Sequence, residues 1–218
     1  MHRMLPRILA LAAGVASITG STTAEPTPRA YTLTVPTTDV LALVQQLAFT
    51  DSGRAYPCRD NPACSTWGQN LILTSPTLGV DGPRLTASMH VTGTYPINQF
   101  FEPQVAGDVV ISAIPVVHNN VVYLTATHIE PGPGDMTFRG FVEVVHTRME
   151  QMLEERASFD LAQYLAAASR DPRLPPPRLP DVRGIDATQI DVRSIASQAN
   201  PAAVVVTVAV RPPSPPPR

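Results

Sequence analysis

The sequence lacks lysine altogether and has only one tryptophan, two cysteines and 16% charged residues. Its 16 arginines stand against 18 acidic residues, so the formal net charge is −2. A weakly acidic chain has no electrostatic footprint for nucleic acid or for an anionic membrane surface. Glycine-rich phosphate loops, the H-E-x-x-H zinc motif and the G-x-S-x-G nucleophile motif are also absent. We therefore expect a protein that is not an enzyme, carries no cofactor and binds no nucleic acid.

The N-terminal segment has the three parts of a secretory signal peptide. Arg3 and Arg7 give it a positive start, residues 8–18 are apolar, and small residues precede a cleavage position after Ala24. The apolar run is too short to span a bilayer, and no later run in the sequence could do so. We expect a signal peptide over residues 1–24 and a mature protein that is soluble, periplasmic or secreted, and without a transmembrane segment.

The two cysteines fall in one short segment, Y-P-C-R-D-N-P-A-C-S-T-W. An even number of cysteines in an exported chain favours a disulfide. A redox site would more typically show C-x-x-C, and a zinc site would need two further ligands nearby. We expect a structural disulfide between Cys58 and Cys64 that closes part of a long loop over residues 50–69 and contributes about 2–3 kcal/mol.

Alternating apolar and polar residues predict strands of an antiparallel sheet. The clearest run is 84–95, in which every second residue is apolar or small and the others are mostly Thr, Ser or His. Residues 105–117 and 121–129 predict a β-hairpin, because Asn119 and Asn120 between them tolerate a positive φ. Shorter strands are expected over residues 31–35, 70–74, 189–196 and 202–211.

Helical spacing appears twice, over residues 37–48 and over residues 137–169, with a kink expected near Ser158. Strands before and after a separate helical block indicate an α+β fold with a mostly antiparallel sheet. A proline-rich connector precedes the last two strands, and those strands are too few for an independent core. We expect one domain over residues 25–211 and a disordered proline-rich tail over residues 212–218.

Histidine, serine and aspartate residues allow two other sites to be imagined. His90 and His128 could meet across strands as metal ligands. Ser88, His90 and Asp108 could form a nucleophile, base and acid arrangement. Neither set has the spacing that marks such a site. We expect surface side chains at these positions, with Asp108 serving the start of its strand after Gly107.

The order of elements resembles the short bacterial periplasmic members of the tubular lipid-binding superfamily, the fold shared with bactericidal/permeability-increasing proteins. The segments that carry the resemblance are Y-T-L-T-V-P-T-T-D-V-L-A-L-V-Q-Q-L-A, N-L-I-L-T-S-P-T-L and G-D-V-V-I-S-A-I-P-V-V-H-N-N-V-V-Y-L-T. The resemblance covers about residues 30–211. It implies a strongly curved antiparallel sheet wrapped around one long amphipathic helix, an apolar ligand in the groove between them, and no catalytic residues.

From these features we expect a protein that binds a lipid or another apolar small molecule between the long helix and the sheet. Methionine suits such a lining because its side chain is adaptable. Two alternatives stay open: a structural or interaction protein of the cell envelope, with a filled core and a protein partner, and a hydrolase. The expected lining is Leu85, Met89, Val91, Val109, Ile111 and Tyr123 on the strands, and Phe141, Val142, Val145, Met149 and Met152 on the helix.

Overall fold

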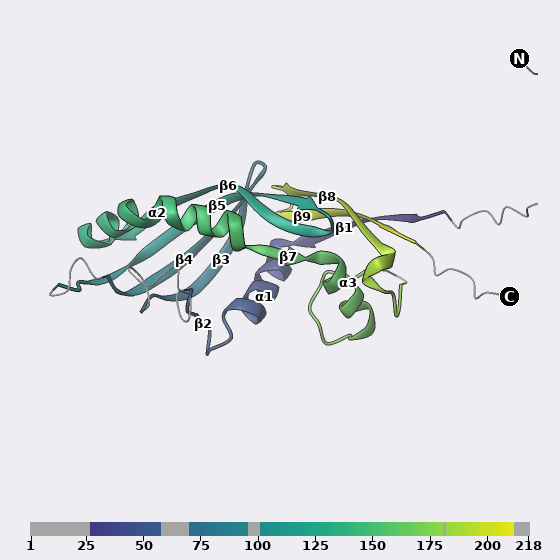
Figure 1. Cartoon of the computed structure of the whole chain (residues 1–218), viewed down its shortest axis with the longest axis horizontal. Coiled ribbons are helices and arrows are strands. Elements are labelled where there is room, and N and C mark those ends of the chain that lie inside the picture. The colour runs from purple at the N-terminus through teal and green to yellow at the C-terminus, as the bar shows by residue number, and fades with distance from the viewer. Residues whose placement is uncertain (1–26, 58–69, 96–100, 181, 212–218) are drawn as a thin grey trace, which may run out of the picture.

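The computed structural model describes residues 27–57, 70–95, 101–180 and 182–211. The predicted signal peptide, the predicted Cys58–Cys64 disulfide and the predicted tail lie outside these residues. Two antiparallel sheets follow one another along an elongated molecule, and three helices cover them (Figure 1). The fold is therefore α+β, as the order of elements predicted.

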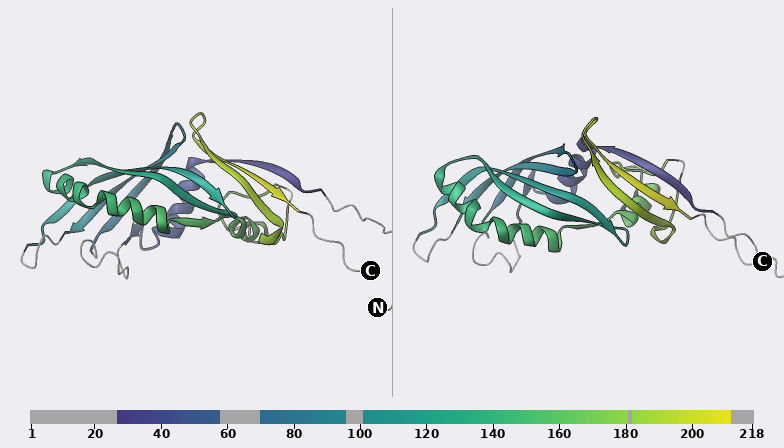
Figure 2. Two further views of the ribbon diagram at one scale, coloured as in Figure 1. Left: turned by 45° about the horizontal axis from the view of Figure 1, so that its top comes forward. Right: turned by 90° about the horizontal axis from the view of Figure 1, so that it is seen from above.

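The larger sheet is strongly curved, like half of a barrel, and its six strands run in the order β2-β3-β4-β5-β6-β7 (Figure 2). All neighbouring strands are antiparallel. The strands are β2 (Arg54–Ala55), β3 (Ile72–Asp81), β4 (Arg84–Thr94), β5 (Gln104–His118), β6 (Val121–Gly134) and β7 (Ser158–Asp160).

Three register shifts interrupt strand pairing in the described part of the larger sheet, one between β3 and β4 and two between β5 and β6. The register of β3 against β4 shifts near Ser75, and that of β5 against β6 shifts near Ala126; both residues have a positive φ. Such bulges bend the strand and exchange the residues that face each side. As a result, Leu73 and Leu78 both face the concave side of the sheet, although one number is odd and the other even.

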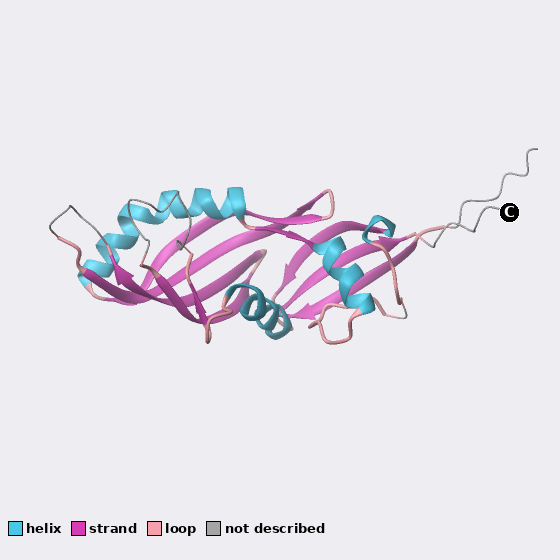
Figure 3. Cartoon of the chain, turned by 60° about the horizontal axis from the view of Figure 1, so that its bottom comes forward, coloured by secondary structure: helices cyan, strands magenta, loops and turns pink. Residues whose placement is uncertain are grey.

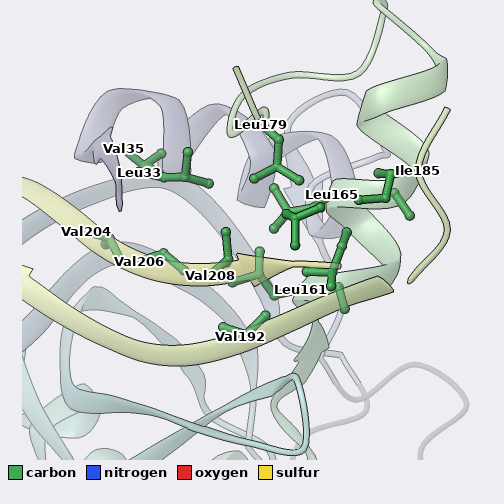
Figure 4. Packing of buried hydrophobic residues seen from close by; sticks show 14 residues of the cluster. Leu33, Val35, Leu161, Leu165, Leu179, Ile185, Val192, Val204, Val206 and Val208 are labelled. Atoms are coloured by element: carbon green, nitrogen blue, oxygen red, sulfur yellow. The ribbon is translucent and has the colours of Figure 1, made fainter. Parts of the chain in front are cut away.

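The smaller sheet has three strands in the order β1-β9-β8, formed by β1 (Arg29–Pro36), β9 (Ala203–Val210) and β8 (Ile190–Gln198). Helix α3 (Leu161–Arg170) packs its buried face on this sheet (Figure 4). Leu165 and Val208 are fully buried at this contact. Burial of such side chains contributes about 1.5–3 kcal/mol each, so this cluster stabilises one end of the molecule.

The predicted single long helix is not confirmed, because the helical stretch is divided. Helix α2 (Met136–Arg156) ends before β7, which pairs with the start of β6. Asp160 then caps α3, since its Oδ1 accepts a hydrogen bond of 2.9 Å from the N–H of Gln163. The break lies where the sequence predicted a kink, but a short strand fills it.

Helix α2 also closes the exposed edge of β6. Because β7 pairs with only three residues of β6, the strand would otherwise leave N–H groups unpaired beyond that point. Glu150 accepts a hydrogen bond of 2.9 Å from the N–H of Ile129, and Glu154 accepts one of 2.7 Å from the N–H of Thr127. These charge-assisted bonds attach the helix to the half-barrel.

The predicted Asn-Asn hairpin turn is confirmed and joins the two sheets. Asn119 and Asn120 have φ values of 50° and 68° between β5 and β6. The Asn120 amide then bonds the backbone of β8: its Nδ2 donates to the carbonyl of Ile190 at 3.2 Å, and its Oδ1 accepts from the N–H of Val192 at 2.7 Å. One side chain thus pairs with the edge of the smaller sheet as a strand would.

We expect Asn120→Ala to lower the free energy of unfolding by about 2–3 kcal/mol. The substitution removes both hydrogen bonds to β8 and places alanine at a positive φ. Asn119→Ala is the matched control, because it has the same backbone cost but its side chain makes no bond to β8. Urea denaturation of both variants separates the loss of the hydrogen bonds to β8 from the backbone cost of alanine at a positive φ. Equal losses in the two variants would show that the link to β8 contributes nothing.

Candidate functional site

An apolar cavity of about 520 Å³ lies where the two sheets meet. It is bounded by helix α1 (Thr37–Ala48), by the concave face of the larger sheet and by the adjoining face of the smaller sheet. Figure 3 shows α1 where the two sheets meet; α1 lies over β3 and α2 lies along β6, and both helices face the concave side of the larger sheet. The volume is within the range of pockets that hold small ligands.

The apolar inner face of β4 forms part of the cavity wall and part of the core. Leu85, Ala87 and Met89 line the cavity. Two residues further along the same face, Val91 is buried beneath α2. Strand β5 does the same, since Ile111, Ala113 and Pro115 line the cavity. Val109, on the same face of β5, lies in the core. Each long strand therefore continues from a filled core into the cavity wall.

Helix α1 supplies one wall through a stripe of apolar side chains. Val40, Val44 and Leu47 recur at helical spacing and all line the cavity. The side chains of Val44 and Leu47 are nevertheless 38% and 57% exposed. Exposed residues that also line a cavity mark its opening, so the mouth lies beside the second half of α1. Thr77 of β3 and Ser158 of β7 also border the cavity, but their side chains are exposed on the outer face of the sheet, because they pair with Ser88 and Tyr123.

The described part of the lining contains no charged side chain. Thr77 and Ser158 alone carry hydroxyl groups, and the Thr77 hydroxyl donates to the carbonyl of Ser88 at 3.4 Å. The remaining lining is Val, Leu, Ile, Ala, Phe, Met and Pro. A lining of this composition suits a molecule whose apolar surface it can remove from water.

The predicted ligand-binding residues divide between the cavity and a filled core. Leu85, Met89 and Ile111 line the cavity. Tyr123 belongs to neither, because its neighbours Val122 and Leu124 face inward and it alternates with them. The residues in the core beneath α2 are Val91, Val109, Phe141, Val142 and Val145, which are buried, and Met149 and Met152, which are partly buried against them.

The space beside α2 is thus occupied by side chains, and the cavity lies beside α1. Phe138 and Phe141 fill the concave face of the half-barrel there, with ring centroids 6.3 Å apart. The apolar spacing over residues 37–48 predicted a helix, but none of its residues was among the predicted lining. The sequence carried a signal, because apolar residues recur at helical spacing along α1, although only Leu43 among its leucines is buried.

The other imagined sites are only partly assembled. His90 Nδ1 lies 2.8 Å from Asp108 Oδ1 on the outer face of the sheet, and both side chains are about 40% exposed. No hydrogen bond joins Ser88 to His90 in the described residues, so a nucleophile–base pair is missing. His128 contacts Glu130 at 3.1 Å and Glu150 at 3.2 Å. Within the described segments, no three or more His, Cys, Asp or Glu side chains are arranged so that they could hold a metal ion.

Comparison with family models, with curated proteins and with solved structures finds no match to this chain. The resemblance to the tubular lipid-binding superfamily therefore stays a prediction. Within the described residues, no helix is long and apolar enough to cross a membrane. The fold and site together define an α+β protein with a curved antiparallel sheet and an apolar cavity at its centre.

Proposed function

We propose that this protein binds a lipid-like apolar ligand in the cavity beside α1, as a non-catalytic periplasmic or secreted carrier. The observation that carries the proposal is a cavity of about 520 Å³ whose described lining is almost wholly apolar. Each 100 Å² of apolar ligand surface buried there would contribute about 2.5 kcal/mol. No chemical step is part of the proposal, because the lining offers no reactive group.

We also propose that the chain is a distant member of the tubular lipid-binding superfamily, with α2 as the long helix around which the sheet curves. The curved antiparallel sheet and the burial of Phe138, Phe141 and Val142 against it support this proposal. The division of the helical block by β7 is the departure from one continuous helix. In this arrangement the ligand would lie next to α1, and not under α2.

We expect native mass spectrometry of gently purified protein to detect a bound apolar molecule. After removal of that molecule, adding an excess of the extracted lipid should raise the melting temperature, because a ligand that binds only the folded state stabilises it by about 2.7 kcal/mol at 100 times its dissociation constant. A bare protein whose melting temperature no lipid changes would contradict the proposal.

The alternative function is that of a cell-envelope interaction protein. The exposed side chains of Met136 and Val144 on α2 favour it, with exposed fractions of 89% and 68%. Exposed apolar side chains mark a partner site where they form a contiguous patch. In the same mass spectrum, a bound protein without a small ligand would support this alternative.

A further inference from the structure

The cavity lies between two hydrophobic clusters, one at each end. Toward the smaller sheet, its lining includes Leu161 and Val206, which belong to the cluster between α3 and that sheet. Toward α2, Met89 and Ile111 are the described residues that both line the cavity and pack against the core beneath α2. A ligand that lies along the concave face of the half-barrel is therefore enclosed between these two ends.

The two ends differ in how completely their side chains are packed. Leu161 and Val206 are 4% and 3% exposed, within a cluster that surrounds them. Met89 and Ile111 also lie on the inner face of the sheet, but both are only partly buried. Their exposed surface borders the cavity, and the filled core lies behind them. Two side chains thus form the end wall next to α2.

Met89 is the more adjustable part of this end wall. Isoleucine is branched at Cβ, which restricts its rotamers, so the position of the Ile111 side chain follows from the backbone of β5. Methionine is unbranched and flexible, and it fills irregular gaps between packed groups. The size of the Met89 side chain therefore decides how far the cavity extends toward the core.

On the basis of the function proposed above, we infer that Met89 is the residue that determines the specificity of the cavity for chain length. With Ile111 it closes the end next to α2, and it thereby sets the longest linear hydrocarbon chain that the cavity holds. Each methylene group that fits inside adds about fourfold to the affinity, because its surface leaves water. A methylene group beyond the length that the end wall allows adds little, because it stays in water.

The test uses straight-chain primary alcohols from octanol to hexadecanol, which differ only in length. Each is used to displace an uncharged naphthylamine dye from delipidated protein. For the wild type, the affinity should rise about fourfold per methylene group and then level off at one chain length. Met89→Ala removes about as much side chain as three methylene groups, so in this variant the rise should continue for about three more carbons.

Met136→Ala is the matched control, because it removes the same atoms from a side chain that is 89% exposed and does not line the cavity. The length limit of this variant should be that of the wild type. Ile111→Val makes a smaller change in the same end wall and should move the limit by about one carbon. It decides the question where Met89→Ala does not fold.

The outcomes separate this inference from the proposed function. A folded Met89→Ala variant with the wild-type length limit would overturn the inference, and so would a wild-type affinity that rises through the whole series. Both results leave the proposed function standing, because the alcohols still bind. If no alcohol displaced the dye, the inference and the proposed function would both be wrong.

Discussion

Ala87→Trp is expected to weaken ligand binding roughly 100-fold while the protein stays folded. Ala87 lies in the cavity wall between Leu85 and Met89 on β4. An indole ring at this position would extend into the cavity and occupy space that the ligand needs. If it displaced about 100 Å² of ligand contact, binding would lose about 2.5 kcal/mol, which is close to 100-fold.

The same argument predicts that the substitution has little effect on stability. Overpacking costs about 1–3 kcal/mol in a filled core, where side chains must move aside, but an open cavity accommodates the ring. Dye binding and urea denaturation measured on one preparation separate the two effects. A loss of binding that followed a loss of folded protein would mean that Ala87 belongs to a filled core.

Ser88→Trp is the matched control for this experiment. Ser88 is the next residue along β4 and faces the outer side of the sheet, opposite Val110 of β5. The same ring added there should leave ligand binding unchanged. If both variants lost binding equally, the effect would come from the strand as a whole, and the cavity would not be the binding site.

Phe138→Ala is expected to lower the free energy of unfolding by about 3–5 kcal/mol, the usual cost of removing a fully buried aromatic ring. Phe138 has no exposed surface and is one of the largest buried side chains. Its ring packs directly on Gly107 and Gly134, which are paired across β5 and β6. Two glycines on adjacent strands leave a recess in the sheet, and the ring fills it.

Gly107→Ala tests the same contact from the other side. A Cβ atom at Gly107 would collide with the Phe138 ring, and one at Gly134 would lie 2.7 Å from it. We expect Gly107→Ala to cost about 1–3 kcal/mol by overpacking. In the double variant with Phe138→Ala, the added methyl group enters the space that the ring left. The double variant should therefore lose less stability than the two single losses added together.

Gly140→Ala is the control for the glycine substitution. Gly140 is the fifth residue of α2, and a Cβ atom there would meet nothing within 4 Å. Alanine should stabilise the helix at this position by about 0.5–1 kcal/mol. Urea denaturation should therefore show a higher free energy of unfolding for Gly140→Ala and a lower one for Gly107→Ala. If Gly140→Ala lowered the free energy of unfolding as much as Gly107→Ala, the recess at Gly107 would not explain the effect.

Local patterns in the sequence predicted much of the fold. The alternation along β4 correctly placed Leu85, Met89 and Val91 on its inner face. The Asn119–Asn120 pair correctly marked the turn between β5 and β6. Both are local signals, because strand geometry sets the facing of each residue and asparagine tolerates a positive φ. For the end of the first helical segment, the sequence predicted only a kink near Ser158. It did not predict that Ser158 pairs with Tyr123 in a strand, because the two residues are distant in sequence.

The location of the cavity could not be predicted in the same way. Leu85 and Val91 belong to one apolar face of one strand, yet the first lines the cavity and the second is buried in the core. The hydrophobicity of a residue indicates that its side chain avoids water. It does not indicate whether that side chain packs in a filled core or lines a cavity. Eight of the eleven residues predicted to line a groove lie elsewhere for this reason.

The sequence by itself determined which residues form strands and helices, which face of each is apolar, and where the hairpin between the longest strands turns. Only the tertiary structure decided that bulky side chains of α2 fill one end of the half-barrel, while α1 leaves space at the other. The difference arises from packing between elements that are far apart in the chain. Whether two apolar faces interlock or leave a gap depends on their separation and on the shapes of the side chains that meet there.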